Sequence, residues 1–187
     1  MRLKIELKRG IDNAPVEAYA VDLAQKHIDE FYSLWLEQLR MFGQEDKYWD
    51  WLFKLSFIEK EDNYEGYAIE CENETQGLMV IETAMHGSWI NPGKRLVYIT
   101  RLVSAPPNRI EIQNPPRFKR VGTVLLRLAR IRSVELGYGG RIGLHSLPNS
   151  EGFYERMNMI NCGKESDDGD NDDDELTYFE YGPLERR

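Results

Sequence analysis

Cysteine is nearly absent from this sequence: two occur in 187 residues, Cys71 and Cys162, far apart and outside any CxxC pattern. That number and spacing exclude a disulfide framework and argue against a zinc site, so we expect no bound metal. Long hydrophobic runs are also missing, since none approaches the roughly 18 residues that suggest a membrane span. The opening MRLKIELKRG alternates in polarity where a signal peptide has an apolar segment. We therefore expect a cytoplasmic protein with no membrane partner.

Acidic charge is concentrated in one short segment. The formal net charge is −8, yet residues 165–175, ESDDGDNDDDE, contain eight acidic and no basic side chains, so the remainder of the chain is neutral overall. A block of like charges repels itself, and we expect a mobile acidic loop at 164–175. Because the rest of the chain has no excess of positive charge, composition gives no sign of a broad nucleic-acid-binding face.

Residue periodicity predicts alternating segments of strand and helix. Leu3, Ile5 and Leu7 alternate with charged residues and predict a first strand, and the helical spacing from Ile28 to Phe42 predicts that a helix follows it. The other expected segments are a helix at 49–58, strands at 66–72, 77–84 and 95–104, a helix from 121 that GYGG at 137–140 ends, a strand at 141–146, a short helix at 149–157 and a strand at 176–182. Two Pro-Pro pairs exclude regular helix from 106–117. This order indicates one α+β domain over residues 1–187, with a mostly antiparallel sheet and a late strand-helix-strand crossover.

The segment RFKRVGTVLL, residues 117–126, breaks a rule of helix electrostatics. Arg117, Lys119 and Arg120 precede an apolar stripe, whereas the helix macrodipole favours acids in the first turn and bases in the last. Cations at that end are explained if a strong anion binds there, because a helix N-terminus offers backbone N–H groups and Gly122 lets a ligand approach the chain. The segment therefore predicts a phosphate or pyrophosphate site, although neither the P-loop nor the GxGxxG pattern occurs.

This segment resembles the pyrophosphate loop of the GCN5-related N-acetyltransferase superfamily, which reads [QR]xxGx[GA] and opens a helix with paired leucines. The places of the motif and the position after it are occupied by Arg117, Phe118, Lys119, Arg120, Val121, Gly122 and Thr123. Arg120 stands where the family usually has its first glycine. The resemblance implies that these residues bind the pyrophosphate of coenzyme A.

Two further segments resemble the same family, in the same order along the chain. VYITRLVSAP resembles the family's fourth strand, whose backbone pairs with pantetheine, and GFYERMNM resembles a late helix whose tyrosine faces the cofactor sulfur. The matching residues are Leu102, Val103 and Ser104 on the strand, Tyr154 on the helix, and Asn149, which matches at a shorter spacing a family asparagine that contacts the cofactor.

The resemblance implies both a fold and a reaction. The fold is a mixed, mostly antiparallel twisted sheet with a central splayed strand pair, flanked by helices. The reaction is transfer of an acetyl group from acetyl-CoA to a primary amine by direct attack in a ternary complex. A backbone N–H near Leu102 or Val103 would polarise the thioester oxygen, and Tyr154 would supply a proton to the departing sulfur.

Two residues are candidates for the base that accepts the amine proton. Glu82 lies on the strand before the cofactor strand, and His145 follows a strand near the expected crossover. His27 and His86 have less to recommend them. The acceptor is a small-molecule or peptide amine that the sequence does not identify, and a homodimer is one assembly we consider.

Two other interpretations stay open. The chain could bind coenzyme A as a regulatory protein without catalysing transfer. It could also bind nucleic acid, since residues 117–132 contain six basic and no acidic side chains. The apolar residues of that same segment demand burial, however, so we expect no nucleic-acid partner.

Overall fold

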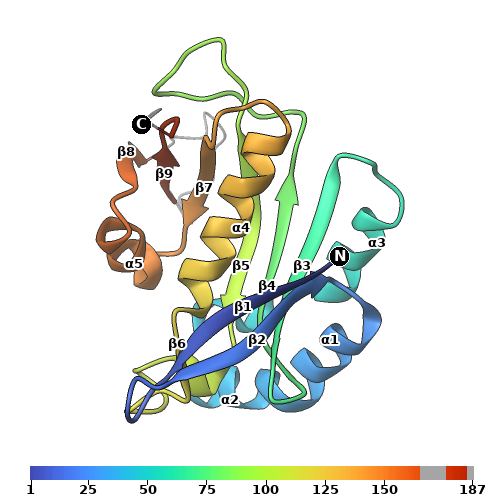
Figure 1. Cartoon of the computed structure of the whole chain (residues 1–187), viewed down its shortest axis with the longest axis vertical. Coiled ribbons are helices and arrows are strands. Elements are labelled where there is room, and N and C mark those ends of the chain that lie inside the picture. The colour runs from blue at the N-terminus through green and yellow to red at the C-terminus, as the bar shows by residue number, and fades with distance from the viewer. Residues whose placement is uncertain (165–175, 185–187) are drawn as a thin grey trace. The chain divides into compact units, whose positions relative to one another are not determined.

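The computed structural model describes residues 1–164 and 176–184 (Figure 1). The chain forms two compact units, Met1–Val80 with Arg101–Leu126 and Ile81–Thr100 with Arg127–Arg187. The boundaries between the two units fall within three elements, namely strands β4 (Glu74–Glu82) and β5 (Val97–Ser104) and helix α4 (Val121–Glu135). The single acetyltransferase domain expected over residues 1–187 stays a prediction, and most of the expected acidic loop lies outside the described residues.

The first unit is built on antiparallel strands. β1 (Arg2–Arg9) pairs with β2 (Pro15–Asp22), β2 pairs with β3 (Tyr64–Cys71), and the short strand β6 (Phe118–Lys119) pairs with the other edge of β1. Hydrogen-bonded neighbours follow the order β6-β1-β2-β3-β4-β5. Glu72 and Asn73 join β3 to β4 with positive φ angles of 53° and 64°, which is the conformation of a two-residue hairpin loop.

Short helices supply much of the hydrophobic core of this unit. They are α1 (Gln25–Glu30), the π-helical turn η1 (Phe31–Trp35), α2 (Leu36–Met41) and α3 (Trp51–Ile58), with 3-10 turns η2 (Glu45–Tyr48) and η3 (Pro106–Asn108). Their buried side chains Ile28, Phe31, Trp35, Leu39 and Trp51 pack in one cluster with residues of β3 and β4. The predicted apolar stripe thus ends one turn early, because Phe42 is 46% exposed.

The second unit contains the crossover. α4 connects β5 to the parallel strand β7 (Ile142–Ser146), and β9 (Thr177–Tyr181) is antiparallel to both of its neighbours, β7 and β8 (Ile160–Lys164). α5 (Glu151–Arg156) follows the 3-10 turn η4 (Pro148–Ser150). Gly137, Gly139 and Gly140 have φ angles of 78°, 68° and 86° directly after α4, as expected for glycines that end a helix.

The α+β class, the mostly antiparallel sheet and the late parallel crossover are confirmed. The expectation that a helix follows the first strand directly is wrong, because β2 intervenes; its buried residues include Ala18 and Ala20, which lack the β-branched signature of a strand. β6 and β8 are absent from the sequence prediction. β6 is two residues long, and no residue of β8 is buried, so neither has a hydrophobic alternation. On α4, Ile131 is 51% exposed and lies outside the buried stripe.

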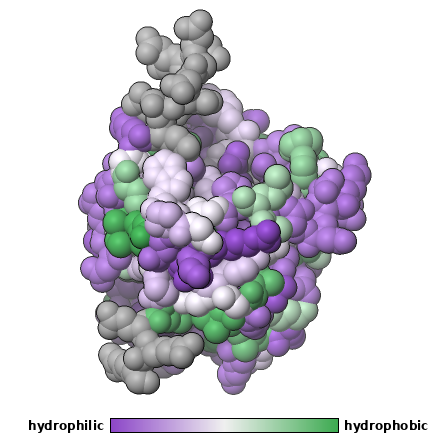
Figure 2. All heavy atoms as spheres, turned by 90° about the horizontal axis from the view of Figure 1, so that it is seen from above, coloured by the Kyte–Doolittle hydropathy of each residue, from purple (hydrophilic) through white to green (hydrophobic). Residues whose placement is uncertain are grey.

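No helix in the described part of the chain is both long and apolar enough to cross a membrane. Most of the surface visible in Figure 2 is hydrophilic, and the hydrophobic residues seen there form small groups. The larger exposed apolar side chains include Met41, Tyr48 and Phe53, on α2, η2 and α3. Exposed apolar residues of this kind are common on folded proteins and need no special explanation.

Gly77 of β4 is where α4 comes close to the sheet. A Cβ atom built on Gly77 would lie 2.5 Å from Val121 Cγ1, 3.1 Å from Leu125 Cδ1 and 3.2 Å from Val103 O. The missing side chain therefore lets the first turn of α4 pack directly on β4 and β5. This contact determines where the N-terminus of α4 lies.

Gly77→Ala is expected to destabilise the protein by about 1–3 kcal/mol, because the stiff, β-branched Val121 cannot withdraw its methyl group unless the helix shifts. Urea unfolding followed by circular dichroism measures the change. Gly152→Ala on α5 is the matched control: its Cβ would meet Arg156 Nη1 at 3.4 Å, and alanine favours a helix by about 0.5–1 kcal/mol over glycine. Equal stability of Gly77→Ala and the parent protein would contradict the close approach.

Candidate functional site

The loop that leads into α4 is fastened to the edge strand β1. β6, inside this loop, pairs with two residues of β1, and Gly10 N donates to Arg117 O at 2.9 Å. A Cβ atom on Gly10 would lie 1.4 Å from Pro116 O, so only glycine allows this approach. The loop backbone is therefore positioned by main-chain contacts of the protein itself.

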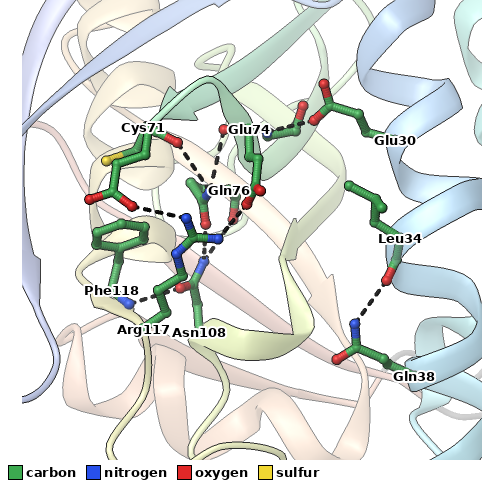
Figure 3. Close-up of polar contacts among 11 residues, drawn as sticks. Glu30, Leu34, Gln38, Cys71, Glu74, Gln76, Asn108, Arg117 and Phe118 are labelled. Carbon is green, nitrogen blue, oxygen red and sulfur yellow. Dashed lines mark hydrogen bonds and ion pairs between the residues drawn. The ribbon is translucent and has the colours of Figure 1, made fainter.

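The side chain of Asn108 joins the loop to β4 (Figure 3). Asn108 Oδ1 accepts a hydrogen bond from Phe118 N at 2.9 Å, and Asn108 Nδ2 donates to Gln76 Oε1 at 3.0 Å. Beside it, Arg117 N donates to Pro107 O at 2.7 Å. These bonds bridge the Pro-rich excursion, so the loop before α4 stays tied to the start of that excursion although many residues separate the two in sequence.

Arg120 has a positive φ of 76°. Residues other than glycine rarely adopt this left-handed conformation, which costs roughly 1–2 kcal/mol. Arg120 occupies the motif position where glycine is usual, so the backbone has the conformation that the motif glycine permits. α4 begins at the next residue, and Val124 N donates to Arg120 O at 2.9 Å. The N–H groups of the first turn have no acceptor within the helix, which makes this end suited to an anion.

The three cations of the loop differ in what they contact. The Arg117 guanidinium pairs with Glu72 at 2.9 Å and also with Glu74, both from the hairpin that joins β3 and β4. Lys119 Nζ donates to an asparagine side chain in the turn between β1 and β2 at 2.8 Å. Arg120 is exposed. To bind an anion at the start of α4, Arg117 would therefore have to exchange its carboxylate partners, whereas Arg120 is exposed to solvent.

The predicted pantetheine strand ends at a residue whose carbonyl group is occupied. Val103 is buried and Leu102 and Ser104 are partly exposed; Ser104 O accepts hydrogen bonds from Arg109 Nε at 3.0 Å and Arg109 Nη2 at 2.9 Å. The same guanidinium donates to Asp46 Oδ1 at 2.9 Å. Both lone pairs of Ser104 O are thus engaged, so this carbonyl group has no acceptor capacity left for pantetheine. The sequence did not single out Arg109, because nothing in its Pro-rich segment distinguishes it from an exposed arginine.

A pocket of about 200 Å³ lies beside Arg117. Its lining includes Trp35 and Gln38 from the helical segment and Thr75 and Gln76 from β4. Thr75 Oγ1 is buried and has no hydrogen-bond partner among the described residues. Pockets that hold drug-sized ligands measure roughly 300–1,000 Å³, so this one is too small for coenzyme A.

In the second unit, the parallel strands β5 and β7 are paired over a short distance. Among the described residues their ladder comprises Val97–Ile142 and Tyr98–Gly143, whereas β7 continues to Ser146 and pairs with β9 along its whole length. The β5-facing backbone groups of β7 beyond Gly143 are outside the ladder. An extended ligand can hydrogen-bond to such groups as an added strand does. This divergence matches the splayed strand pair that the resemblance implies.

Tyr154 of α5 is 6% exposed, and its ring lies 5.7 Å from that of Phe179 on β9. Burial raises the pKa of the Tyr154 hydroxyl above its ordinary value, so the group stays protonated at neutral pH. Thr177 Oγ1 donates to Glu151 Oε1 at 2.6 Å and fastens α5 to β9. Asn149, in η4, is exposed.

Four side chains of the second unit form a chain of contacts, here called the histidine–tyrosine cluster: Glu82, His86, Tyr98 and His145. Glu82 Oε2 lies 2.7 Å from His86 Nδ1. The rings of His86 and Tyr98 stack with centroids 3.9 Å apart and planes at 10°, and Tyr98 OH lies 2.7 Å from His145 Nδ1. The structure thus brings both candidate bases into one cluster, together with His86. No group of three or more His, Cys, Asp or Glu residues that could hold a metal ion occurs in the described ranges.

The candidate bases differ in access to solvent. Glu82 is 0% exposed, and its carboxylate accepts hydrogen bonds from Ala84 N at 2.6 Å and from Met85 N at 2.8 Å. His145 packs beside two tyrosine rings, with centroid distances of 5.0 and 5.8 Å. The His86 side chain is 43% exposed. In the sequence His86 is not distinguished from other histidines, since only the turn of the chain after β4 brings it next to Glu82.

The fold described here is that of the GCN5-related N-acetyltransferases, so the resemblance is confirmed at the level of the fold. The chain is similar to Ard1 from Thermoplasma volcanium, with a TM-score of 0.61, 12% identity and coverage of 90% of this chain and 99% of that one. It is also similar to the GNAT domain of S. lividans PAT, with a TM-score of 0.56, 15% identity and coverage of 96% of both chains. A GCN5-related N-acetyltransferase from Ralstonia eutropha JMP134 has a TM-score of 0.56 and 18% identity, over 80% of this chain and 97% of that one. No model of a known protein family matches the sequence, and neither does any curated protein.

Arg120→Gly is expected to be more stable than Arg120→Ala by about 1 kcal/mol, because both variants lose the same charge and only glycine adopts this positive φ without steric strain. Urea unfolding of the two variants measures the difference. Lys119→Gly and Lys119→Ala are the matched control pair, since Lys119 lies in β6, where alanine should be the more stable of the two. If Arg120→Ala equals or exceeds Arg120→Gly, the left-handed conformation is incorrect.

Proposed function

We propose that this protein is an N-acetyltransferase that transfers an acetyl group from acetyl-CoA to a primary amine, by direct attack in a ternary complex. The observation that carries the proposal is the backbone of the 117–123 loop. Arg120 has the left-handed conformation at the place of the motif glycine, and a helix of 15 residues begins at the next residue. The acetyltransferase fold supports the same reading, but fold alone does not define an activity.

The start of α4 would hold the pyrophosphate of acetyl-CoA. Backbone N–H groups of Val121, Gly122 and Thr123 would donate to its oxygens, and the exposed Arg120 would supply a positive charge. Phe118 is 2% exposed, so its part would be to hold the loop in place. Pantetheine would extend along β5, where a backbone N–H of Leu102 or Val103 would donate to the thioester oxygen as negative charge develops on it.

The reaction itself needs a neutral amine and a stabilised leaving group. The amine lone pair attacks the thioester carbon, a C–N bond forms, the C–S bond breaks, and the electron pair goes to sulfur. Tyr154 would donate a hydrogen bond to that sulfur, because its raised pKa keeps the hydroxyl protonated. The hydrogen bond would lower the energy of the departing thiolate relative to the thioester.

Acetyl-CoA is expected to raise the melting temperature of the protein, and Gly122→Glu is expected to abolish the shift. A ligand at one hundred times its Kd stabilises by about 2.7 kcal/mol, which a thermal scan detects readily. An acidic side chain in the first turn interacts favourably with the helix dipole, so Gly122→Glu should repel pyrophosphate without destabilising α4. Met41→Glu adds the same charge on an exposed face of α2 and should leave the shift unchanged. No shift in the parent protein would overturn the proposal.

Tyr154→Phe is expected to lower kcat by about 10²-fold or more while leaving acetyl-CoA binding within about twofold, because phenylalanine keeps the packing against Phe179 and loses only the hydroxyl. Acetyl-CoA consumption with a panel of amines, amino acids, aminoglycosides and lysine peptides gives the rate, and calorimetry gives the affinity. An unchanged kcat would remove Tyr154 from the chemistry. Acetyl-CoA binding without turnover of any amine would favour a non-catalytic CoA-binding protein instead.

A further inference from the structure

We propose that His86 is the general base that takes the proton from the acceptor amine, and that Glu82 and Tyr98 are the residues that position it. This inference rests on the proposed acetyltransferase function. It reassigns Glu82 from a base to a positioning residue. It also gives a role to a histidine that the sequence alone does not distinguish.

Glu82 holds one side of the His86 ring. Its carboxylate accepts hydrogen bonds from Ala84 N at 2.6 Å and from Met85 N at 2.8 Å, which turns the chain back after β4 and brings His86 Nδ1 to 2.7 Å from Oε2. A carboxylate can only accept in this contact, so Nδ1 carries the hydrogen. The other ring nitrogen, Nε2, is then the one with a lone pair free to accept a proton.

Tyr98 fixes the plane of the same ring. The two rings are nearly parallel, with an angle of 10° and centroids 3.9 Å apart, and the Tyr98 hydroxyl is itself held by His145 Nδ1 at 2.7 Å. His86 is thus constrained at one edge by a buried carboxylate and on one face by an aromatic ring. A general base needs this degree of fixation, because its effect depends on the geometry of proton transfer.

The cluster lies where the strand splay begins. Tyr98 and Gly143 form the last described pair of the β5–β7 ladder, and His145 lies on β7 just beyond it. Gly143 also leaves room for Tyr178 of β9, whose hydroxyl would lie 2.2 Å from a Cβ there. Tyr98 lies on the same strand as Leu102, four residues before it, which is roughly 13 Å along an extended strand. Under the proposed function the amine proton would therefore reach His86 through water and not by direct contact at the thioester.

Access favours His86 over the other two candidates. Glu82 is 0% exposed and engaged by backbone N–H groups, so an amine cannot reach it. His145 uses Nδ1 for Tyr98 and packs against Tyr178 at 5.0 Å. His86 alone of the three combines a buried carboxylate partner with a side chain that is 43% exposed.

The proton balance follows from this arrangement. An acceptor ammonium group gives one proton to His86 Nε2 and becomes a neutral amine, whose lone pair attacks the thioester carbon. The imidazolium that forms is stabilised by the Glu82 carboxylate, and the proton is later released to solvent. The amine loses its second proton as the amide forms, and this proton ends on the sulfur, which leaves as the thiol of coenzyme A. Acetyl-CoA and an ammonium group thereby yield an acetamide, coenzyme A and one proton.

A first test needs no acceptor. Long-range proton–nitrogen NMR of the histidine rings, with His86 assigned by His86→Gln, is expected to show a hydrogen on Nδ1 and none on Nε2 in the neutral form of the His86 ring. In Glu82→Gln the amide can donate to Nδ1, so the hydrogen should shift to Nε2. A wild-type ring with the hydrogen on Nε2 would overturn the assignment of His86 as base.

The second test is the pH dependence of acetyl transfer to the best amine of the panel. The groups that contact the His86 ring in the described residues are Glu82 and Tyr98, and Tyr98 in turn contacts His145. His86→Gln is expected to lower kcat by about 10²–10⁴-fold near neutral pH, and by less near pH 10, where a lysine-like amine loses its proton to solvent without help. Glu82→Gln should lower kcat in the same range and leave the KM for acetyl-CoA unchanged.

Met85→Gln is the matched control, since it alters the adjacent side chain of the same loop, which is 77% exposed, and keeps the backbone N–H. It should behave as the parent protein. If the parent acetylates an amine and His86→Gln has the same pH profile, this inference fails and the proposed function stands. If the parent binds acetyl-CoA but acetylates no amine, the proposed transferase activity fails and the inference fails with it.

Discussion

The contact of the first turn of α4 with Gly77 is the constraint on which the position of the helix N-terminus and of the loop before it depends. A β-carbon at this position would lie 2.5 Å from Val121, so the helix can sit on β4 and β5 only because the side chain is missing. With the helix start fixed, the residue before it must turn sharply, and Arg120 takes a left-handed φ of 76°. Strain held at a helix N-terminus by good packing around it is typical of a binding site.

Polar side chains of the Pro-rich excursion complete this end of the first unit. Asn108 links Phe118 to Gln76, and Arg109 links Ser104 to Asp46, so the excursion is held to the sheet by hydrogen bonds although residues 109–117, after η3, form neither helix nor strand. Each of these groups is at least partly buried and paired, as the cost of an unsatisfied polar group requires. The basic segment that looked contrary to helix electrostatics is therefore partly neutralised by carboxylates of the β3–β4 hairpin, with Arg120 left exposed.

The second unit uses buried carboxylates in a related way. Glu82 accepts two backbone N–H groups and faces His86, and Glu180 accepts from Trp89 N at 2.8 Å and from the Ser88 hydroxyl. Both acids are 0% exposed and both hold the segment that connects β4 to β5. Because a buried carboxylate is costly unless its oxygens are satisfied, this segment has a defined conformation without secondary structure of its own. The same contacts orient His86 against Tyr98.

Local pattern was sufficient to determine the α+β class, the crossover and the loop ahead of α4, because helical spacing, alternation and glycine at a helix end are properties of neighbouring residues. Local pattern did not predict strands β2 and β8, since alanines and exposed residues form a strand only where a neighbouring strand pairs with them. Arg109 and His86 were likewise unremarkable in sequence. Arg109 contacts Ser104 and Asp46, and His86 contacts Glu82 and Tyr98. Only the tertiary structure brings these partners within hydrogen-bond or stacking distance, because burial and the choice of partner are set by contacts between different segments of the chain.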